Sequence, residues 1–127
     1  MYKSLTVIIP VYNEKDTVKD CIERVLKADT CGLTLNIIVS DNNSTDGTKE
    51  ILKSINDEKV KCYFKEKNEG KGSNIKNALQ YAFGDLILFQ DADLEYHPEN
   101  FPDLINPFIK NNADVVFGTR LTGSKIT

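Results

Sequence analysis

The sequence predicts an α/β domain, a three-layer sandwich built around a mainly parallel sheet. Short apolar runs rich in β-branched residues alternate with longer stretches whose apolar residues recur at helical spacing. Five such runs and four such stretches fill the 127 residues. Strands that alternate with helices are joined by right-handed crossovers, which makes neighbouring strands parallel. We therefore expect a single Rossmann-like domain spanning residues 1–127.

The strands are predicted where the apolar runs lie. These runs cover residues 5–11, 35–39, 60–64, 86–90 and 113–117. Pro10 has no backbone N–H to donate to a ladder, so it is expected to mark the end of the first strand.

The helices are predicted from their apolar faces. The inward-facing sets are Val18, Cys21, Ile22, Val25 and Leu26; Ile51, Leu52 and Ile55; Ile75, Ala78, Leu79 and Ala82; and Phe101, Leu104, Ile105, Phe108 and Ile109. Ser44 or Thr45 is the expected N-cap of the second helix. The last helix is expected to begin near Pro98 and to kink at Pro107.

Composition excludes several classes of protein. The 16 Lys and Arg residues are scattered, and the formal net charge is -3, so no nucleic-acid interface is expected. The longest apolar runs are of strand length, too short to span a bilayer. The N-terminus turns polar too early for a signal peptide. Cys21, Cys31 and Cys62 lack the spacing of a zinc site and are expected to be reduced thiols in a cytoplasmic protein.

The acidic residues after the fourth predicted strand are the first candidate site. Asp91, Asp93 and Glu95 follow residues 86–90, at the carboxyl end of a strand, where open α/β sheets bind ligands. Two carboxylates one residue apart suit a hard divalent cation that completes its shell with water and substrate phosphates. A solvated turn is the alternative, because a short motif of this kind also arises by chance.

Four polar clusters fall on the same edge of the predicted sheet. They are residues 12–14, 40–46, 91–95 and 118–120, and Gly70-Lys71-Gly72 opens a helix nearby. Helix capping, turn glycines and solvated surface charges are the alternative explanations.

The chemistry of these clusters favours a nucleotide-diphosphate ligand. Asp41 precedes the capping residues and is expected to be spare, so it could accept a hydrogen bond from a nucleobase N–H. Tyr12 offers a flat face, with Glu14 as a second acceptor beside it. Lys71 and Arg120 are candidate phosphate contacts.

Five segments together resemble family 2 glycosyltransferases, most of all the branch that includes dolichyl-phosphate mannosyl- and glucosyltransferases. The segments are VIIPVYNE at 7–14, SDNNSTDGT at 40–48, NEGKG at 68–72, QDADLEY at 90–96 and GTR at 118–120. They occur in the family's order and spacing over nearly the whole chain.

The resemblance implies a GT-A fold, a UDP- or GDP-linked sugar donor, and an inverting transfer assisted by Mg or Mn. By position, the nucleoside would be lined by Pro10, Tyr12, Glu14, Val39 and Asp41. Asp91, Ala92 and Asp93 would hold the diphosphate and the metal, with Glu95 as a further ligand. Asp91 and Asp93 are thus the catalytic candidates, and Arg120 would approach a phosphate. A polyprenyl phosphate is one implied acceptor, in glycan or cell-envelope biosynthesis.

Two departures from the family pattern leave alternatives open. Asp41-Asn42-Asn43 stands where many relatives have Asp-Asp-Gly, so the preferred base is undetermined. The chain ends soon after the fifth predicted strand, and we expect it to be the donor half of a longer protein, with the acceptor region and any membrane segment further on. A nucleotide-sugar-binding fragment without turnover is the second hypothesis. A haloacid-dehalogenase-type phosphatase is the third, disfavoured because Glu95 replaces the expected Thr or Val.

Overall fold

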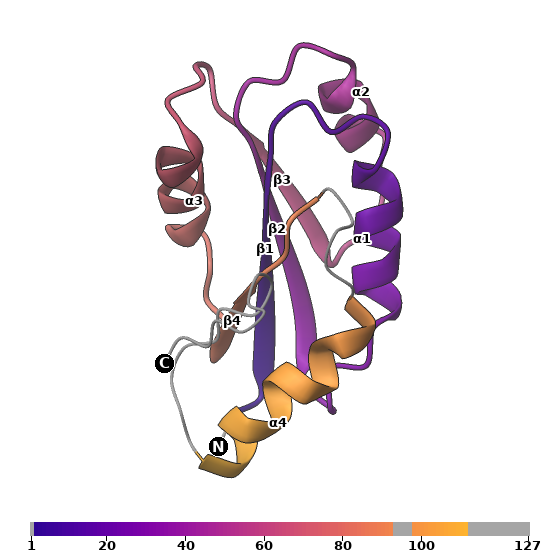
Figure 1. Cartoon of the computed structure of the whole chain (residues 1–127), viewed down its shortest axis with the longest axis vertical. Coiled ribbons are helices and arrows are strands. Elements are labelled where there is room, and N and C mark those ends of the chain that lie inside the picture. The colour runs from indigo at the N-terminus through magenta and orange to yellow at the C-terminus, as the bar shows by residue number, and fades with distance from the viewer. Residues whose placement is uncertain (1, 93–97, 112–127) are drawn as a thin grey trace.

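The computed structural model describes residues 2–92 and 98–111. Strands and helices alternate from the N-terminus, as the sequence predicts (Figure 1). The elements are β1 (Ser4–Val11), α1 (Val18–Lys27), β2 (Thr34–Asp41), α2 (Thr48–Lys53), β3 (Val60–Phe64), α3 (Lys71–Leu79), β4 (Leu86–Phe89), the 3-10 turn η1 (Pro98–Asn100) and α4 (Phe101–Asn111). The strand predicted at 113–117 lies outside the described residues.

The four described strands form one parallel sheet in the order β3-β2-β1-β4. The chain adds β2 and β3 on one side of β1 and then returns to add β4 on the other side. Leu5 of β1 pairs with Leu35 of β2 and with Leu86 of β4. The order of strands therefore reverses between β1 and β4, and ligands of such sheets bind beyond the strand ends at this switch point.

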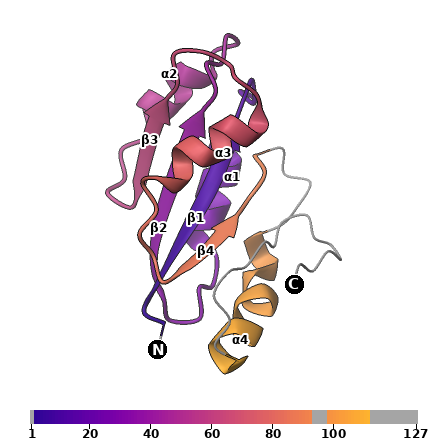
Figure 2. The ribbon, with the colours of Figure 1, turned by 90° about the vertical axis from the view of Figure 1, so that its left-hand side faces the viewer.

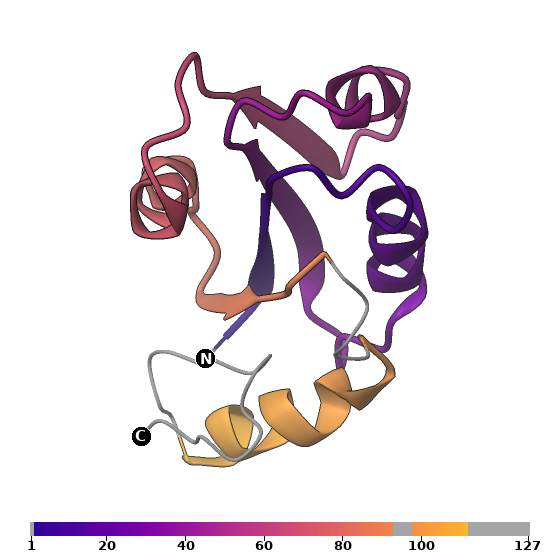
Figure 3. The same ribbon diagram turned by 45° about the horizontal axis from the view of Figure 1, so that its top comes forward.

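Helices cover both faces of the sheet, which confirms the predicted α/β sandwich. Figures 1 and 3 show α1 and α2 on one face and α3 alone on the other. In Figure 2, α3 lies across the sheet in front of the viewer, and α4 lies beside β4. Both views place the loops that leave β1 and β2 at the same end of the sheet.

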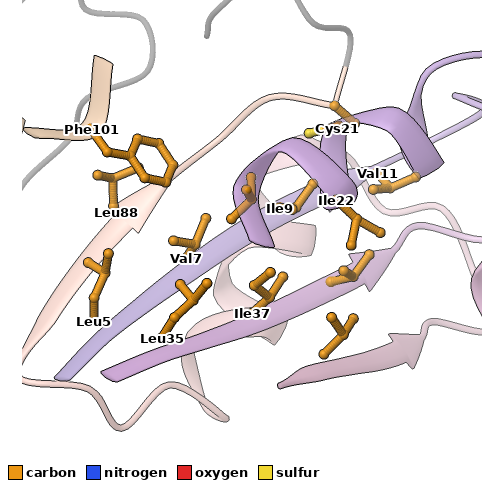
Figure 4. Packing of buried hydrophobic residues seen from close by; sticks show 14 of the residues in the cluster. Leu5, Val7, Ile9, Val11, Cys21, Ile22, Leu35, Ile37, Leu88 and Phe101 are labelled. Carbon is orange, nitrogen blue, oxygen red and sulfur yellow. The ribbon is translucent and has the colours of Figure 1, made fainter. Parts of the chain in front are cut away.

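The apolar core is divided by the sheet, because alternate residues of a strand point to opposite faces. The face under α1 holds the larger cluster, to which β1 contributes Leu5, Val7, Ile9 and Val11. Figure 4 shows Cys21 and Ile22 of α1 above this row, with Phe101 of α4 against Leu88. The smaller cluster, under α3, is built on Ile8, Ile38 and Ala78.

The inward face of α1 is the predicted one, whereas that of α3 is confirmed only in part. Val18, Cys21, Ile22 and Val25 are all buried in α1. In α3 the predicted Ala78 is buried, but Leu79 is 40% exposed and the polar Asn74 is buried in its place. Asn74 hydrogen-bonds to the ends of two strands, and that polar contact sets the rotation of the helix.

The predicted N-cap of the second helix is wrong. The helix begins at Thr48, after Gly47, whose φ of 107° lies in the left-handed region. Ser44 instead donates its hydroxyl to Asp41, and Asn13 donates its backbone N–H to the Ser44 hydroxyl. Ser44 is therefore committed to a turn before the helix and cannot cap it. In α4, Pro107 lies inside the helix without ending it.

The three cysteines are separate thiols. Cys21 is buried in the larger cluster and Cys62 lies in β3, as predicted. Burial, reinforced by the nearby Asp41 carboxylate, raises the pKa of the Cys62 thiol to about 11.

Candidate functional site

A cavity of about 320 Å³ opens at the carboxyl ends of the strands. Residues from the ends of β1 and β4 and from the start of α3 meet there. The lining consists of Pro10, Val11, Tyr12, Glu14, Asn42, Asn68, Lys71, Asn74, Asp91 and Ala92. The cavity thus lies at the switch point between β1 and β4. Six predicted site residues are brought together in it: Pro10, Tyr12, Glu14, Lys71, Asp91 and Ala92.

The turn after β1 presents Tyr12 and Glu14. Tyr12 is 43% exposed, and the next residue, Asn13, has a positive φ of 52° that turns the chain. The Oδ1 atom of Asn13 accepts the Thr45 N–H at 2.8 Å. The Glu14 N–H donates to Thr48 Oγ1 at 3.0 Å. The turn is therefore fixed to the loop after β2, and the tyrosine ring is left available at the rim.

Val39 and Asp41, the other two residues expected near the nucleoside, are not among the residues that line the cavity. Val39 is fully buried in the larger cluster because its position in β2 faces α1. Asp41 is also fully buried: its Oδ1 accepts the Ser44 hydroxyl at 2.6 Å and its Oδ2 accepts the Ser44 N–H at 2.9 Å. Asp41 is therefore not spare; it closes the turn that carries Asn42.

Asn42 lines the cavity, at a sequence position where many relatives have a second acid. Its Nδ2 donates to Asn68 Oδ1 at 2.9 Å and to the Gly70 carbonyl at 3.3 Å. Its Oδ1 accepts the Glu69 N–H at 3.4 Å. An amide both donates and accepts, whereas an ionised carboxylate only accepts. The asparagine therefore ties the loop before α3 to the end of β2.

Asn74 is a second buried amide that the sequence analysis missed. Its Nδ2 donates to the Ser40 carbonyl at 2.8 Å and to the Val11 carbonyl at 3.4 Å. Its Oδ1 accepts the Ser40 hydroxyl at 2.6 Å. These bonds attach the first turn of α3 to the ends of β1 and β2. In the sequence, the only indication of this role is the position of Asn74, about one helical turn after Lys71 and therefore on the same side of the helix.

Lys71 and Asp91 face each other across the cavity. The Lys71 Nζ lies 3.3 Å from Asp91 Oδ1, and their side chains are 60% and 17% exposed. Lys71 is the first residue of α3 and follows Gly70, whose φ is 96°. The first turn of a helix carries unpaired N–H groups and a partial positive charge, both suited to an anion. A helix start suited to an anion and a carboxylate are thus side by side.

The backbone of Asp91 is held from two directions. The Gln90 Nε2 donates to the Asp91 carbonyl at 3.1 Å, and the Cys21 Sγ lies 3.6 Å from the same oxygen. Gln90 and Cys21 are both buried. The carboxylate at the cavity is therefore presented by a fixed strand end.

The donor set partly fits a magnesium or manganese ion. Within residues 2–92 and 98–111, no three His, Cys, Asp or Glu side chains gather as a metal cage. Such ions need only one or two carboxylates when a substrate supplies phosphate oxygens, and Asp91 lines the cavity. Asp93, Glu95 and Arg120, the other predicted contacts, lie outside the described residues.

Comparison with known proteins shows to which protein family this chain belongs. The fold is that of GT-A glycosyltransferase domains. The chain belongs to glycosyl transferase family 2, whose family model matches residues 6–126.

A relative among curated proteins agrees with this assignment. The chain is 35% identical over 124 residues to the dolichol-phosphate mannosyltransferase of Pyrococcus furiosus. The match covers 96% of this chain and 35% of the relative. The chain therefore spans about a third of the relative's length.

Two solved structures share the fold. The first is S. aureus TarS 1-349 in complex with UDP, with a TM-score of 0.73 and 27% identity over 87% of this chain and 33% of that one. The second is the glucosyl-3-phosphoglycerate synthase of Mycobacterium tuberculosis in complex with Mn2+, UDP and glucosyl-3-phosphoglycerate. Its TM-score is 0.68, with 26% identity over 84% of this chain and 39% of that one.

Proposed function

We propose that this chain binds a nucleotide-diphosphate sugar together with Mg or Mn, and forms the donor side of an inverting glycosyltransferase. The observation that carries the proposal is the cavity in which Lys71 and Asp91 meet beside Tyr12. A cation for the diphosphate, a carboxylate for a metal and an aromatic ring for the base are the three parts such a ligand requires.

The ligand is oriented by the walls of the cavity. The nucleoside lies along the β1 turn, against Pro10, Tyr12 and Glu14. The diphosphate lies at the start of α3 beside Lys71, with Ala92 close to it. No side-chain contact from Val39 is proposed, and Asp41 acts by holding the turn that carries Asn42.

The acidic segment after β4 receives the metal in this proposal. Asp91 and Asp93 bind it, Glu95 is a further ligand, and Arg120 approaches a phosphate. When bound, a divalent cation neutralises the charge that develops on the departing diphosphate. The manganese in the mycobacterial relative's structure supports this choice of metal.

The reaction proposed is a single displacement at the anomeric carbon of the sugar. The acceptor oxygen forms the new bond to that carbon while the bond to the diphosphate breaks from the opposite side, which inverts the configuration. The diphosphate leaves with the bonding electron pair. Lys71 and the first turn of α3 stabilise its negative charge.

A lipid phosphate is the proposed acceptor. The name of the archaeal relative, a dolichol-phosphate mannosyltransferase, supports this choice. A phosphate acceptor is already ionised at neutral pH, so its attack requires no general base from the chain. In the two described stretches, no helix combines the length and apolarity needed to cross a bilayer.

Calorimetric titration of UDP and GDP, each with and without Mn²⁺, tests the proposal. Wild-type protein is expected to bind one nucleotide more tightly than the other, and only when the metal is present. Asp91→Asn and Asp93→Ala are each expected to abolish the metal-dependent part. Asp103→Asn removes an exposed acid of α4 and serves as the matched control. Failure of wild-type protein to bind either nucleotide would overturn the proposal.

A product assay separates a transferase from a binding fragment. Incubating the chain with a radiolabelled nucleotide sugar and a short polyprenyl phosphate should yield labelled lipid if this chain alone turns over. Tight metal-dependent binding without product would identify the chain as the donor-binding portion of a longer enzyme. The length of the archaeal relative, about three times that of the matched region, favours the same assay on a longer chain.

A further inference from the structure

Lys71 is the only cationic side chain among the described residues that line the cavity. The lining also holds two acids, Glu14 and Asp91. The Lys71 ammonium lies 3.3 Å from Asp91 Oδ1 when no ligand is bound. The same ammonium is the proposed partner of the donor diphosphate. Among the described residues, Asp91 is the acid that pairs with the Lys71 ammonium before a ligand binds. A bound diphosphate would offer the same ammonium a second anionic partner.

The backbone of Lys71 is fixed while its side chain is not. Asn42 binds the carbonyl of Gly70, just before Lys71, and Asn74 anchors the following turn to the ends of β1 and β2. The Lys71 side chain is 60% exposed and has a flexible four-carbon stem. A change of partner by Lys71 therefore requires only a rotation of its side chain.

We propose that Lys71 is an exchangeable counter-ion: it occupies the place of the metal at Asp91 until the donor binds, and then moves to the diphosphate. This inference rests on the proposed function of the cavity. A divalent cation at Asp91 would repel an ammonium group within a few ångströms, so metal binding disfavours the ion pair between Lys71 and Asp91. The incoming diphosphate provides the alternative partner for Lys71.

Because of this exchange, the affinity for the metal and the affinity for the nucleotide depend on each other. Metal alone must displace Lys71 from Asp91 without giving the ammonium a new partner, so Lys71 weakens the binding of free metal. When the nucleotide is present, the displaced ammonium is paired again. By linkage, each ligand then raises the affinity for the other by the same factor.

Lys71→Met tests the inference, because the two affinities should move in opposite directions. Free Mn²⁺, measured by electron paramagnetic resonance in the absence of nucleotide, should bind about three- to tenfold more tightly to the variant. UDP or GDP, whichever wild-type protein prefers, should bind about tenfold more weakly at saturating Mn²⁺. A lysine that only contacts phosphate would leave the affinity for free metal unchanged.

Lys76→Met is the matched control, because it removes an exposed lysine of the same helix outside the cavity. Neither affinity should change in this variant, which excludes a general effect of net charge. Lys71→Arg keeps the positive charge and should bind free Mn²⁺ about as weakly as wild-type protein.

The inference is overturned if Lys71→Met does not bind free Mn²⁺ more tightly than wild-type protein, whether both bind equally or neither binds. The proposed function would survive that result as long as wild-type protein binds nucleotide and Mn²⁺ together. If wild-type protein binds no nucleotide, the proposed function fails first.

Discussion

Asn74, which lines the cavity, is joined to the buried Ser40 by two hydrogen bonds. The Asn74 Nδ2 donates to the Ser40 carbonyl at 2.8 Å, and the Ser40 hydroxyl donates to Asn74 Oδ1 at 2.6 Å. Asn77 adds a third contact, from its Nδ2 to Ser40 Oγ at 3.1 Å. The start of α3 is thus attached to the end of β2 by buried hydrogen bonds. Helices usually contact a sheet through apolar side chains.

Asn74→Ala should destabilise the fold by about 1–3 kcal/mol, because it removes the acceptor of the buried Ser40 hydroxyl proton and the donor to the Ser40 carbonyl. Urea denaturation followed by circular dichroism measures the loss. Asn56→Ala, in an exposed turn, is the control and should change stability by less than about 0.5 kcal/mol. An equal effect of the two variants would contradict the structural role given to Asn74.

Gly84→Ala and Gly72→Ala should change stability in opposite directions. A Cβ at Gly84 would lie 2.6 Å from Thr6 Oγ1 and 2.8 Å from the Thr6 backbone nitrogen, so β1 would have to shift. We expect a loss of about 1–3 kcal/mol from this overpacking. A Cβ at Gly72, in α3, meets nothing within 4 Å. Alanine there should stabilise the protein by about 0.5–1 kcal/mol, measured in the same urea titration.

Asp85 should make stability depend on pH in the acid range. Its Oδ2 accepts the backbone N–H groups of Lys3 and Ser4 at 2.6 and 3.2 Å. The bond from Lys3 is the main cause that lowers the pKa of Asp85 below its ordinary value. A lowered folded-state pKa adds stability above the unfolded-state pKa, about 3.9, and that stability is lost as the pH falls through the folded-state value.

The Asp85→Asn variant isolates this contribution. Wild-type protein should be more stable than the variant at pH 7, and the difference should shrink progressively below about pH 4. Urea midpoints measured at several pH values provide the comparison. A difference that stays constant down to pH 2 would contradict the assigned role of the carboxylate.

The three thiols should differ in reactivity with a disulfide reagent at pH 8. Burial raises the pKa of Cys62 to about 11, so little thiolate is present there at pH 8. Burial and the nearby Asp29 raise the pKa of Cys31 as well, but its half-buried side chain lies in the turn before β2. Native protein should therefore label first at Cys31, and Cys31→Ser should remove the fast phase. Fast labelling that persists in Cys31→Ser would disprove this order.

The alternation of strands and helices was predictable because burial imposes a period on the sequence. Residues 5–11 and 86–89 are mostly apolar because both faces of the strands are covered by helices. The inward face of α1 was predictable for the same reason, since its buried residues are all apolar. The edge of the sheet that carries the cavity was predictable from the parallel arrangement of the strands, because the carboxyl ends of parallel strands share one edge.

The predictions that failed concern residues held in place by hydrogen bonds. Such residues leave no periodic pattern of apolar residues in the sequence. From the sequence, Asn74 would be expected to face solvent. It is buried because it donates hydrogen bonds to carbonyl groups at the ends of two strands. Asp41 reads as an unused acid, yet Ser44 binds both of its oxygens. Ser44 could not be recognised as a turn residue in place of a cap, because both roles use the same hydroxyl chemistry.

The central position of β1 has a consequence for how the chain folds during synthesis. β1 can pair with β2 soon after both have left the ribosome, since Leu5 pairs with Leu35. Its other edge pairs with β4, where Leu5 meets Leu86, so that edge stays open until most of the described chain has been made. An open strand edge is a template for pairing with other chains. The nascent protein therefore passes through an interval in which one edge of its central strand is open to pairing with other chains.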